Sequence, residues 1–148
     1  MMIDRFEQFS ISIFNISHYW NKIAAEEMKN YGLRGGYALY LIVLSRCDND
    51  ITSAKLADLC QRDKGDVSRA ISAFQKAGLL EPYGKNRYRA PLILTDEGRK
   101  MVDQLAAKAS LILEQAGEGL TAQMRENLYP SLDLIAKNMK KISEKGRT

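Results

Sequence analysis

The stretch that decides the fold runs from Ile51 to Thr95 and reads ITSAKLADLCQRDKGDVSRAISAFQKAGLLEPYGKNRYRAPLILT. It holds two short helical patterns separated by a polar turn. Thr52 or Ser53 can cap the first helix and Asp63 the second, because short oxygen-bearing side chains accept hydrogen bonds from the free amides of a helix start. The second helix carries its apolar residues at steps of three and four and ends at Gly78. The pattern predicts a helix-turn-helix.

The residues after the second helix predict a small β-hairpin. Leu79 to Tyr83 and Arg87 to Leu94 are extended in character, and residues 84–86 form a turn between them. Pro82 and Pro91 cannot donate backbone hydrogen bonds, so the hairpin should be small and edge-like. A basic hairpin behind a helix-turn-helix is a wing. The predicted fold class is therefore mainly α with a small β-hairpin wing, a winged helix-turn-helix.

The excess positive charge of the chain lies in this stretch. Seven basic and three acidic side chains fall between Gln61 and Ala90, a net of +4, which equals the formal net charge of all 148 residues. Charge that serves solubility alone is spread along a chain, whereas a concentrated basic surface suits the phosphates of nucleic acid. A run of basic residues is more often just a solvent-exposed surface with no binding role. Its coincidence with helix-turn-helix geometry favours double-stranded DNA as the partner here.

The residues predicted to contact DNA fall into three groups. The start of the second helix should enter the major groove, where the planar fork of Arg69 matches a guanine edge and Gly65 allows a close approach. The wing cations should reach the minor groove. Side chains of the first helix and Lys76 should contact phosphates, which position the protein without reading sequence. The full set is Thr52, Ser53, Lys55, Lys64, Gly65, Ser68, Arg69, Ser72, Lys76, Lys85, Arg87 and Arg89.

Four short motifs resemble the MarR (multiple antibiotic resistance regulator) family. They are Leu56-Ala57, Asp63-Lys64-Gly65-Asp66-Val67-Ser68-Arg69, Lys76-Ala77-Gly78-Leu79-Leu80 and Leu94-Thr95-Asp96-Glu97-Gly98. The chain departs from the family pattern at Gly65, where a hydroxyl residue is usual, and at residues 86–89, which lack the usual acid. The resemblance implies a transcription regulator, predicted to be a repressor, that binds a palindromic operator as a homodimer and is released by a small ligand.

The resemblance also implies an inducer cleft between the first helix, the second helix and the helix after the wing. Tyr37 and Tyr40 could line such a cleft, although buried tyrosines at helical spacing are more often plain packing. His18, the only histidine, could be a ligand-pocket or pH-responsive group, or an ordinary residue on the flank of its helix. His18, Tyr37 and Tyr40 are the candidate pocket residues.

Helices on both sides of the winged region, residues 33–95, predict a dimerisation region at residues 4–29 and 96–145. Large apolar residues recur at alternating steps of three and four near both ends of the chain, and such seams need a partner helix. We expect the two seams to meet across a twofold axis, which would place two recognition helices about 34–36 Å apart. Gly35-Gly36 lies in or just ahead of the helix over 33–47, and Pro130 should kink or restart the last helix.

The rest of the composition argues against other classes of protein. One histidine and two separated cysteines, Cys47 and Cys60, offer no catalytic or metal-binding cluster, so we expect no enzyme, cofactor or metal. The cysteines are either redox-sensing thiols or small apolar residues, and packing is the favoured interpretation. No apolar run approaches the roughly 20 residues of a membrane span, and no signal peptide is visible, so a cytoplasmic location is expected. The alternative function is a winged-helix module for protein contacts without DNA binding.

Overall fold

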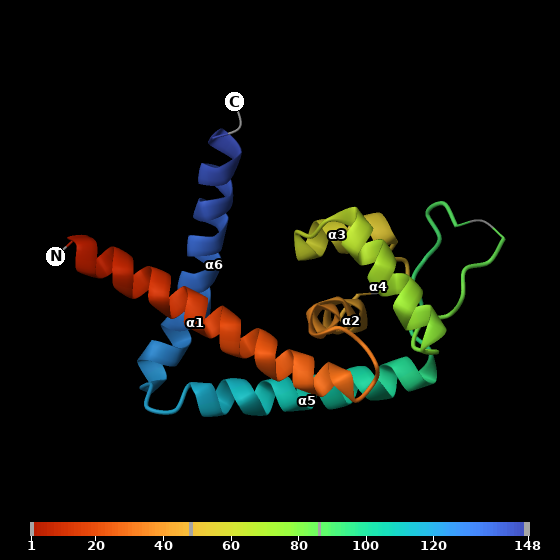
Figure 1. The fold of residues 1–148 in the computed structure, drawn as a ribbon, viewed down its shortest axis with the longest axis horizontal. Helices are drawn as coiled ribbons and strands as arrows, with labels where there is room; N and C mark the ends of the chain where they lie inside the picture. The colour runs from red at the N-terminus through yellow and green to blue at the C-terminus, as the bar shows by residue number, and fades with distance from the viewer. Residues whose placement is uncertain (1, 48, 86, 147–148) are drawn as a thin grey trace. The chain divides into compact units, whose positions relative to one another are not determined.

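The computed structural model describes residues 2–47, 49–85 and 87–146, and most of these residues are helical (Figure 1). The predicted mainly α fold class is confirmed. The residues group into two compact units, Met1–Ala107 and Lys108–Thr148. The helices are α1 (Met2–Lys29), a short 3-10 helix η1 (Gly35–Tyr37), α2 (Ala38–Ser45), α3 (Ser53–Cys60), α4 (Lys64–Lys76), α5 (Asp96–Ala116) and α6 (Ala122–Lys145).

The first unit has an apolar core in which α2 lies next to η1 and α3, while α3 lies next to α4. Nearly every residue of α2 is apolar, and Tyr40, Leu41 and Leu44 of this helix are buried in the core. The rings of Tyr37 and Phe74 pack edge to face, with their centroids 5.9 Å apart. The buried core residues are Met28, Tyr37, Tyr40, Leu41, Leu44, Ile51, Leu56, Ala57, Val67, Ala70, Ile71, Phe74, Leu79, Leu80, Leu92, Leu94, Met101, Val102 and Leu105.

The two glycines before α2 lie in η1, ahead of the helix proper. A Cβ atom on Gly35 would stand only 2.7 Å from the Cα atom of Ala25 in α1. The chain therefore passes α1 more closely than any residue with a side chain would allow. A Cβ atom on Gly36 would meet nothing within 4 Å, so the close approach concerns Gly35 alone.

The two strands predicted for the wing are not confirmed. Within the described residues, the segment from Leu79 to Leu94 contains a single isolated antiparallel bridge, between Leu80 and Leu94. Glu81 donates its backbone N–H to Ile93 O over 2.8 Å, but Leu92 donates to Ile51 O and not to the opposite arm. Because Pro82 and Pro91 have no N–H to give, the ladder cannot extend past its first rung. Residues 81–93, without the undescribed Asn86, are called the wing segment below.

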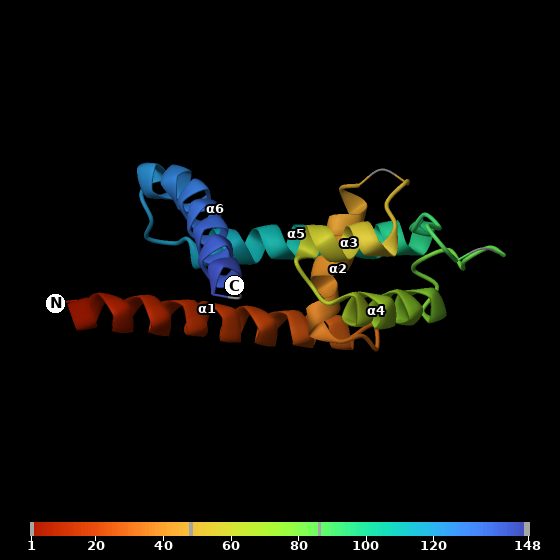
Figure 2. The same ribbon diagram turned by 90° about the horizontal axis from the view of Figure 1, so that it is seen from above.

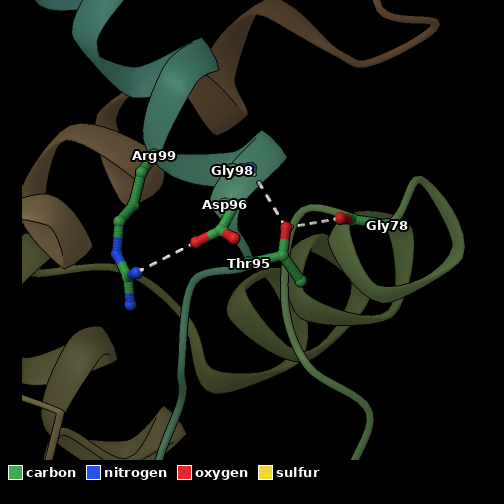
Figure 3. A network of polar contacts seen from close by, with 5 residues as sticks. All are labelled: Gly78, Thr95, Asp96, Gly98 and Arg99. Carbon is green, nitrogen blue, oxygen red and sulfur yellow. Dashed lines mark hydrogen bonds and ion pairs between the residues drawn. The ribbon is translucent and has the colours of Figure 1, made fainter.

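The end of α4 is tied to the start of α5 by the side chain of Thr95 (Figure 3). Its hydroxyl donates to Gly78 O over 2.6 Å and accepts from Gly98 N–H over 3.0 Å, so one oxygen caps α5 and holds the turn after α4. Gly78 has φ +75°, the left-handed conformation that ends many helices. Gly98 is buried, and a Cβ atom there would lie 2.1 Å from Leu79 O.

The second unit consists of the end of α5, a turn, and α6. Thr121 caps α6 by accepting from Met124 N–H over 3.2 Å, and Arg125 donates to Gly117 O over 2.8 Å across the turn. Pro130, which the sequence predicts to kink or restart the last helix, lies inside α6, and the helix does not restart there. No described residue of α6 is buried within the single chain, although its apolar residues are large.

Replacing Gly98 by alanine tests the close contact between the turn after α4 and α5. The added methyl cannot fit 2.1 Å from Leu79 O, so the free energy of unfolding should fall by about 1–3 kcal/mol as the backbone shifts. Urea unfolding followed by circular dichroism measures the change. Gly36→Ala is the matched control because its methyl meets open space. Equal stability of the two variants would contradict the packing described here.

Candidate nucleic-acid interface

The helix-turn-helix is formed as predicted, by α3 and α4. Thr52 caps α3 by accepting from Lys55 N–H over 3.3 Å, and Asp63 caps α4 by accepting from Asp66 N–H over 3.3 Å. Between the helices, Gln61 adopts the left-handed conformation with φ 52°, which ends α3 abruptly. Figures 1 and 2 both show α3 and α4 as neighbours, with the wing segment beyond the end of α4.

One face of α4 is buried and the opposite face is free. Val67, Ala70, Ile71 and Phe74 are all 2% exposed or less, and their spacing puts them on one side of the helix. The residues predicted to enter the major groove lie on the free side. Lys64, Gly65, Ser68, Arg69, Ser72 and Lys76 are all exposed.

The free face of α4 is joined to α2 at its first turn. Tyr40, in α2, donates its hydroxyl to Asp66 Oδ2 over 2.5 Å. The other carboxylate oxygen, Oδ1, stands 3.7 Å from Nη2 of Arg69, one turn further along α4. Burial, together with the hydrogen bond and the charge of Asp66, raises the pKa of the Tyr40 phenol above its usual range, so the hydroxyl remains a donor at any ordinary pH.

The position of Gly65 bears on the same group of side chains. A Cβ atom on this residue would lie 2.9 Å from Asp63 Oδ2 and 3.4 Å from Arg69 Nη1. The space in front of Gly65 is therefore bordered by the capping carboxylate and the guanidinium. The sequence predicted only that Gly65 lets the backbone approach DNA, and it contained no sign of these neighbours.

The wing segment carries its cations outward. Lys85, Arg87 and Arg89 are exposed, and the guanidinium carbon of Arg89 lies 5.2 Å from the centre of the Tyr88 ring. Arg89 has φ 54°, which is uncommon for a residue with a side chain. At the base, burial raises the pKa of the Tyr83 phenol, while the charge of Arg87 and a hydrogen bond from Ser53 oppose the rise.

The backbone N–H of Leu92, which donates to Ile51 O over 2.8 Å, ties the wing segment to the chain just ahead of α3. Ser53 and Thr52 are both half-buried, and Thr52 acts as the cap of α3. Lys55, by contrast, is exposed in the first turn of α3. The three groups predicted to contact DNA are thus brought together in the first unit, on α3, α4 and the wing segment.

The three candidate pocket residues have different surroundings in the structure. Tyr37 and Tyr40 are buried, at 6% and 1% exposure, and the ring of Tyr37 lies near those of Tyr40 and Phe74, which agrees with the packing interpretation. His18 is exposed on α1, with its ring 5.0 Å from that of Tyr19.

A cleft of about 320 Å³ lies elsewhere in the first unit, where the ends of α1 and α4 meet the first turns of α5. The side chains of Tyr31 and Gln104 are hydrogen-bonded over 3.0 Å at this cleft. No sequence pattern marks it, because its walls come from three separate segments. Its lining residues are Tyr31, Ala77, Leu79, Glu97, Lys100, Met101 and Gln104.

Cys47 and Cys60 are free thiols, half-buried against the apolar core. Burial raises the pKa of the Cys60 thiol, against the opposing charge of Arg62, and a raised pKa lowers the reactive thiolate fraction. Within the described ranges, no group of three or more His, Cys, Asp or Glu side chains could hold a metal ion. None of the described helices combines the length and apolar character that crossing a bilayer requires.

A helix-turn-helix whose second helix has an exposed basic face, followed by a basic wing segment, defines the class of winged-helix folds. No family model matches the sequence, and no curated protein matches it significantly. Solved structures do match, over most of the chain.

A MarR transcriptional regulator from Methanosarcina mazei Go1 is 25% identical, with a TM-score of 0.78 over 92% of this chain and 99% of its own. A Listeria monocytogenes protein assigned to the MarR family, solved in complex with a 26mer DNA, is 26% identical, with a TM-score of 0.76 over 86% of each chain. The S. aureus MepR–DNA complex, at 19% identity, has a TM-score of 0.77 over 88% of this chain and 97% of its own. The chain has the fold of MarR-family transcriptional regulators, which confirms the resemblance found in its motifs.

Replacing Asp63 by alanine tests the cap of α4. Losing the acceptor leaves the Asp66 amide without its partner, so the free energy of unfolding should fall by about 1 kcal/mol. Urea unfolding measures the change, with Asp58→Ala on the exposed side of α3 as the control that removes the same charge. If both variants lose equally little stability, Asp63 is not acting as a cap.

Proposed function

We propose that the chain is a sequence-specific transcriptional regulator, a repressor that binds double-stranded DNA as a homodimer on a palindromic operator. The observation that carries the proposal is the free face of α4, where Lys64, Arg69 and Lys76 stand exposed opposite a fully buried apolar face. The net charge of the chain is concentrated on this helix and the wing segment. The solved DNA complexes of similarly folded proteins add support.

The proposed binding mode divides the contacts between two grooves. The free face of α4, through Lys64, Ser68, Arg69 and Ser72, enters the major groove, and Arg69 reads a guanine edge. Arg87, with Lys85 or Arg89, reaches the minor groove. Lys76, Thr52, Ser53 and Lys55 contact phosphates and set the register of the protein on the duplex.

The homodimer is proposed to cover the apolar side chains of the terminal helices. In α1, Phe6, Phe14 and Ile16 are 71%, 74% and 66% exposed, and in α6 Ile142 is 65% exposed. Contiguous apolar surface of this kind is unfavourable in water and marks an interface. The seam spacing in both helices suits a helical partner, which a second copy of the chain supplies.

The proposal includes release from DNA by a small ligand, which would bind in the cleft at the end of α4. A small ligand there would touch Ala77 and Leu79 on one side and Lys100 of α5 on the other. Thr95 joins these same segments, so a bound molecule would change the orientation of α4 relative to α5. DNA binding and ligand binding would then be coupled through one junction.

Fluorescence anisotropy with a mixed-sequence duplex at two salt concentrations tests DNA binding. Each phosphate contact releases counterions, so the logarithm of the binding constant should fall with the logarithm of salt concentration by about 0.9 per contact. Selection of bound duplexes from a random pool then gives the operator. The alternative, a winged-helix module for protein contacts, predicts neither binding nor a salt dependence, and that result would reject the proposal.

Arg87→Ala tests the role of the wing segment. Losing a cation that contacts the minor groove and its phosphates should weaken binding to every operator variant and reduce the salt slope by about one. Lys137→Ala is the matched control, because it removes the same charge from α6, where Lys137 pairs with Asp133 over 2.8 Å. Unchanged affinity and slope for Arg87→Ala would exclude Arg87 from the interface.

Ile16→Glu tests the dimer. The wild-type protein should sediment with twice the 16.7 kDa mass of one chain, and a charge placed in the apolar seam should shift it toward the single-chain mass. Gln8→Glu, at an exposed polar position of the same helix, should leave the mass unchanged. A wild-type protein that sediments as one chain at micromolar concentration would contradict the dimer.

A further inference from the structure

Three side chains from two helices form a continuous polar chain at the start of α4. Tyr40 of α2 donates to one carboxylate oxygen of Asp66 over 2.5 Å, and the other oxygen faces the guanidinium of Arg69 at 3.7 Å. The chain runs from the buried core to the exposed face proposed to read DNA. The side chain of Asp66 is 37% exposed and that of Arg69 is 64% exposed, so their ion pair stands at the surface.

The inner end of this chain is rigid. Tyr40 is 1% exposed, and its ring packs near that of Tyr37, with centroids 6.2 Å apart. A buried ring fixes the position of its hydroxyl, and the hydroxyl in turn fixes the carboxylate of Asp66. Because α2 and α4 contribute one partner each, the orientation of Asp66 depends on the packed core and not on α4 alone.

The outer end of the chain lies beside Gly65. Nη1 of Arg69 would be 3.4 Å from a Cβ atom at Gly65, which is about van der Waals contact. The guanidinium therefore lies close against the first turn of α4. Nη2 faces Asp66 and the remaining N–H groups of the fork stay available to a ligand.

We propose that Asp66, held by Tyr40, is a positioning residue that aims Arg69 at guanine. The inference rests on the proposed function and adds the element that gives the arginine its direction. A flexible arginine can turn toward phosphates or toward several base edges. A guanidinium held on one side by a carboxylate instead presents its remaining N–H donors in one direction. Guanine offers two acceptors in that geometry and adenine offers one, so orienting the fork favours G·C pairs.

Electrostatic repulsion and positioning of Arg69 predict opposite changes in DNA affinity when Asp66 is neutralised, so an experiment can distinguish them. Asp66 carries a negative charge close to the DNA-facing surface, and simple repulsion by phosphates means that neutralising it should strengthen binding to every duplex. If Asp66 positions Arg69, neutralising Asp66 should instead weaken binding to the operator, and to the operator alone. The reason is that the guanidinium of Arg69 would no longer be held toward guanine. The effect on operator affinity should be about three- to fivefold, at the upper end of what an exposed ion pair contributes.

Anisotropy titrations with three duplexes test the proposal: the selected operator, the operator with one G·C pair per half-site changed to A·T, and a random sequence. The pair to change is the one whose replacement weakens wild-type binding but leaves Arg69→Ala unaffected. Asp66→Asn keeps an acceptor for the Tyr40 hydroxyl, and Tyr40→Phe keeps the buried ring, so both variants should remain folded. Unfolding curves verify this.

We expect Asp66→Asn to lower the preference for the G·C operator over the A·T operator by about three- to fivefold, while binding to random duplex stays equal or rises. Tyr40→Phe should act in the same direction. Neither substitution should alter the preference when Arg69 is already alanine. Asp58→Asn, the matched removal of one charge from exposed α3, should leave the preference unchanged.

An unchanged preference in Asp66→Asn would overturn the positioning role. A wild-type protein that binds no duplex in preference to another would instead overturn the proposed function itself. The two failures are therefore separate outcomes of the same titrations.

Discussion

Burial of one face of α4 is the constraint on which the rest of the structure depends. Val67, Ala70, Ile71 and Phe74 recur at helical spacing, and their transfer out of water fixes the rotation of the helix about its own axis. Fully burying side chains of this size favours the packed state by about 1.5–3 kcal/mol for each of the larger ones. With that rotation set, Lys64, Ser68 and Arg69 must face solvent.

Polar contacts at the two ends of α4 add precision to this packing. At the start, Asp63 caps the helix and Asp66 is held by Tyr40. At the end, Thr95 joins the turn to α5, and Gly98 allows the backbone of Leu79 to approach closely. A helix fixed at both ends presents its free face in one orientation, which is what reading a base edge requires.

Much of this arrangement follows from local sequence patterns. The caps at Thr52 and Asp63, the apolar period of α4 and the turn at Gly78 are all readable from neighbouring residues. The wing strands are not confirmed, and an extended pattern does not reveal that Leu92 gives its N–H to Ile51. Pro82 and Pro91 indicated a weak ladder but not how short it would be.

The contacts that were not predictable join residues far apart in the chain. Tyr40 and Asp66 are 26 positions apart, and the cleft at the end of α4 takes its walls from three segments. Helical spacing placed Tyr40 in the core without indicating where its hydroxyl points. Likewise the sequence suggested only that Gly65 lets the backbone approach DNA. The folded chain reveals that the carboxylate of Asp63 and the guanidinium of Arg69 lie beside it.

The account stands on the free face of α4 being the surface that meets duplex DNA. Mapping the backbone amide signals of the protein by NMR during titration with the selected operator tests this most directly. The largest changes should fall on residues 64–76 and on the wing segment, with smaller ones in the first turn of α3. Changes confined to α1 and α6, or none at saturating duplex, would contradict it.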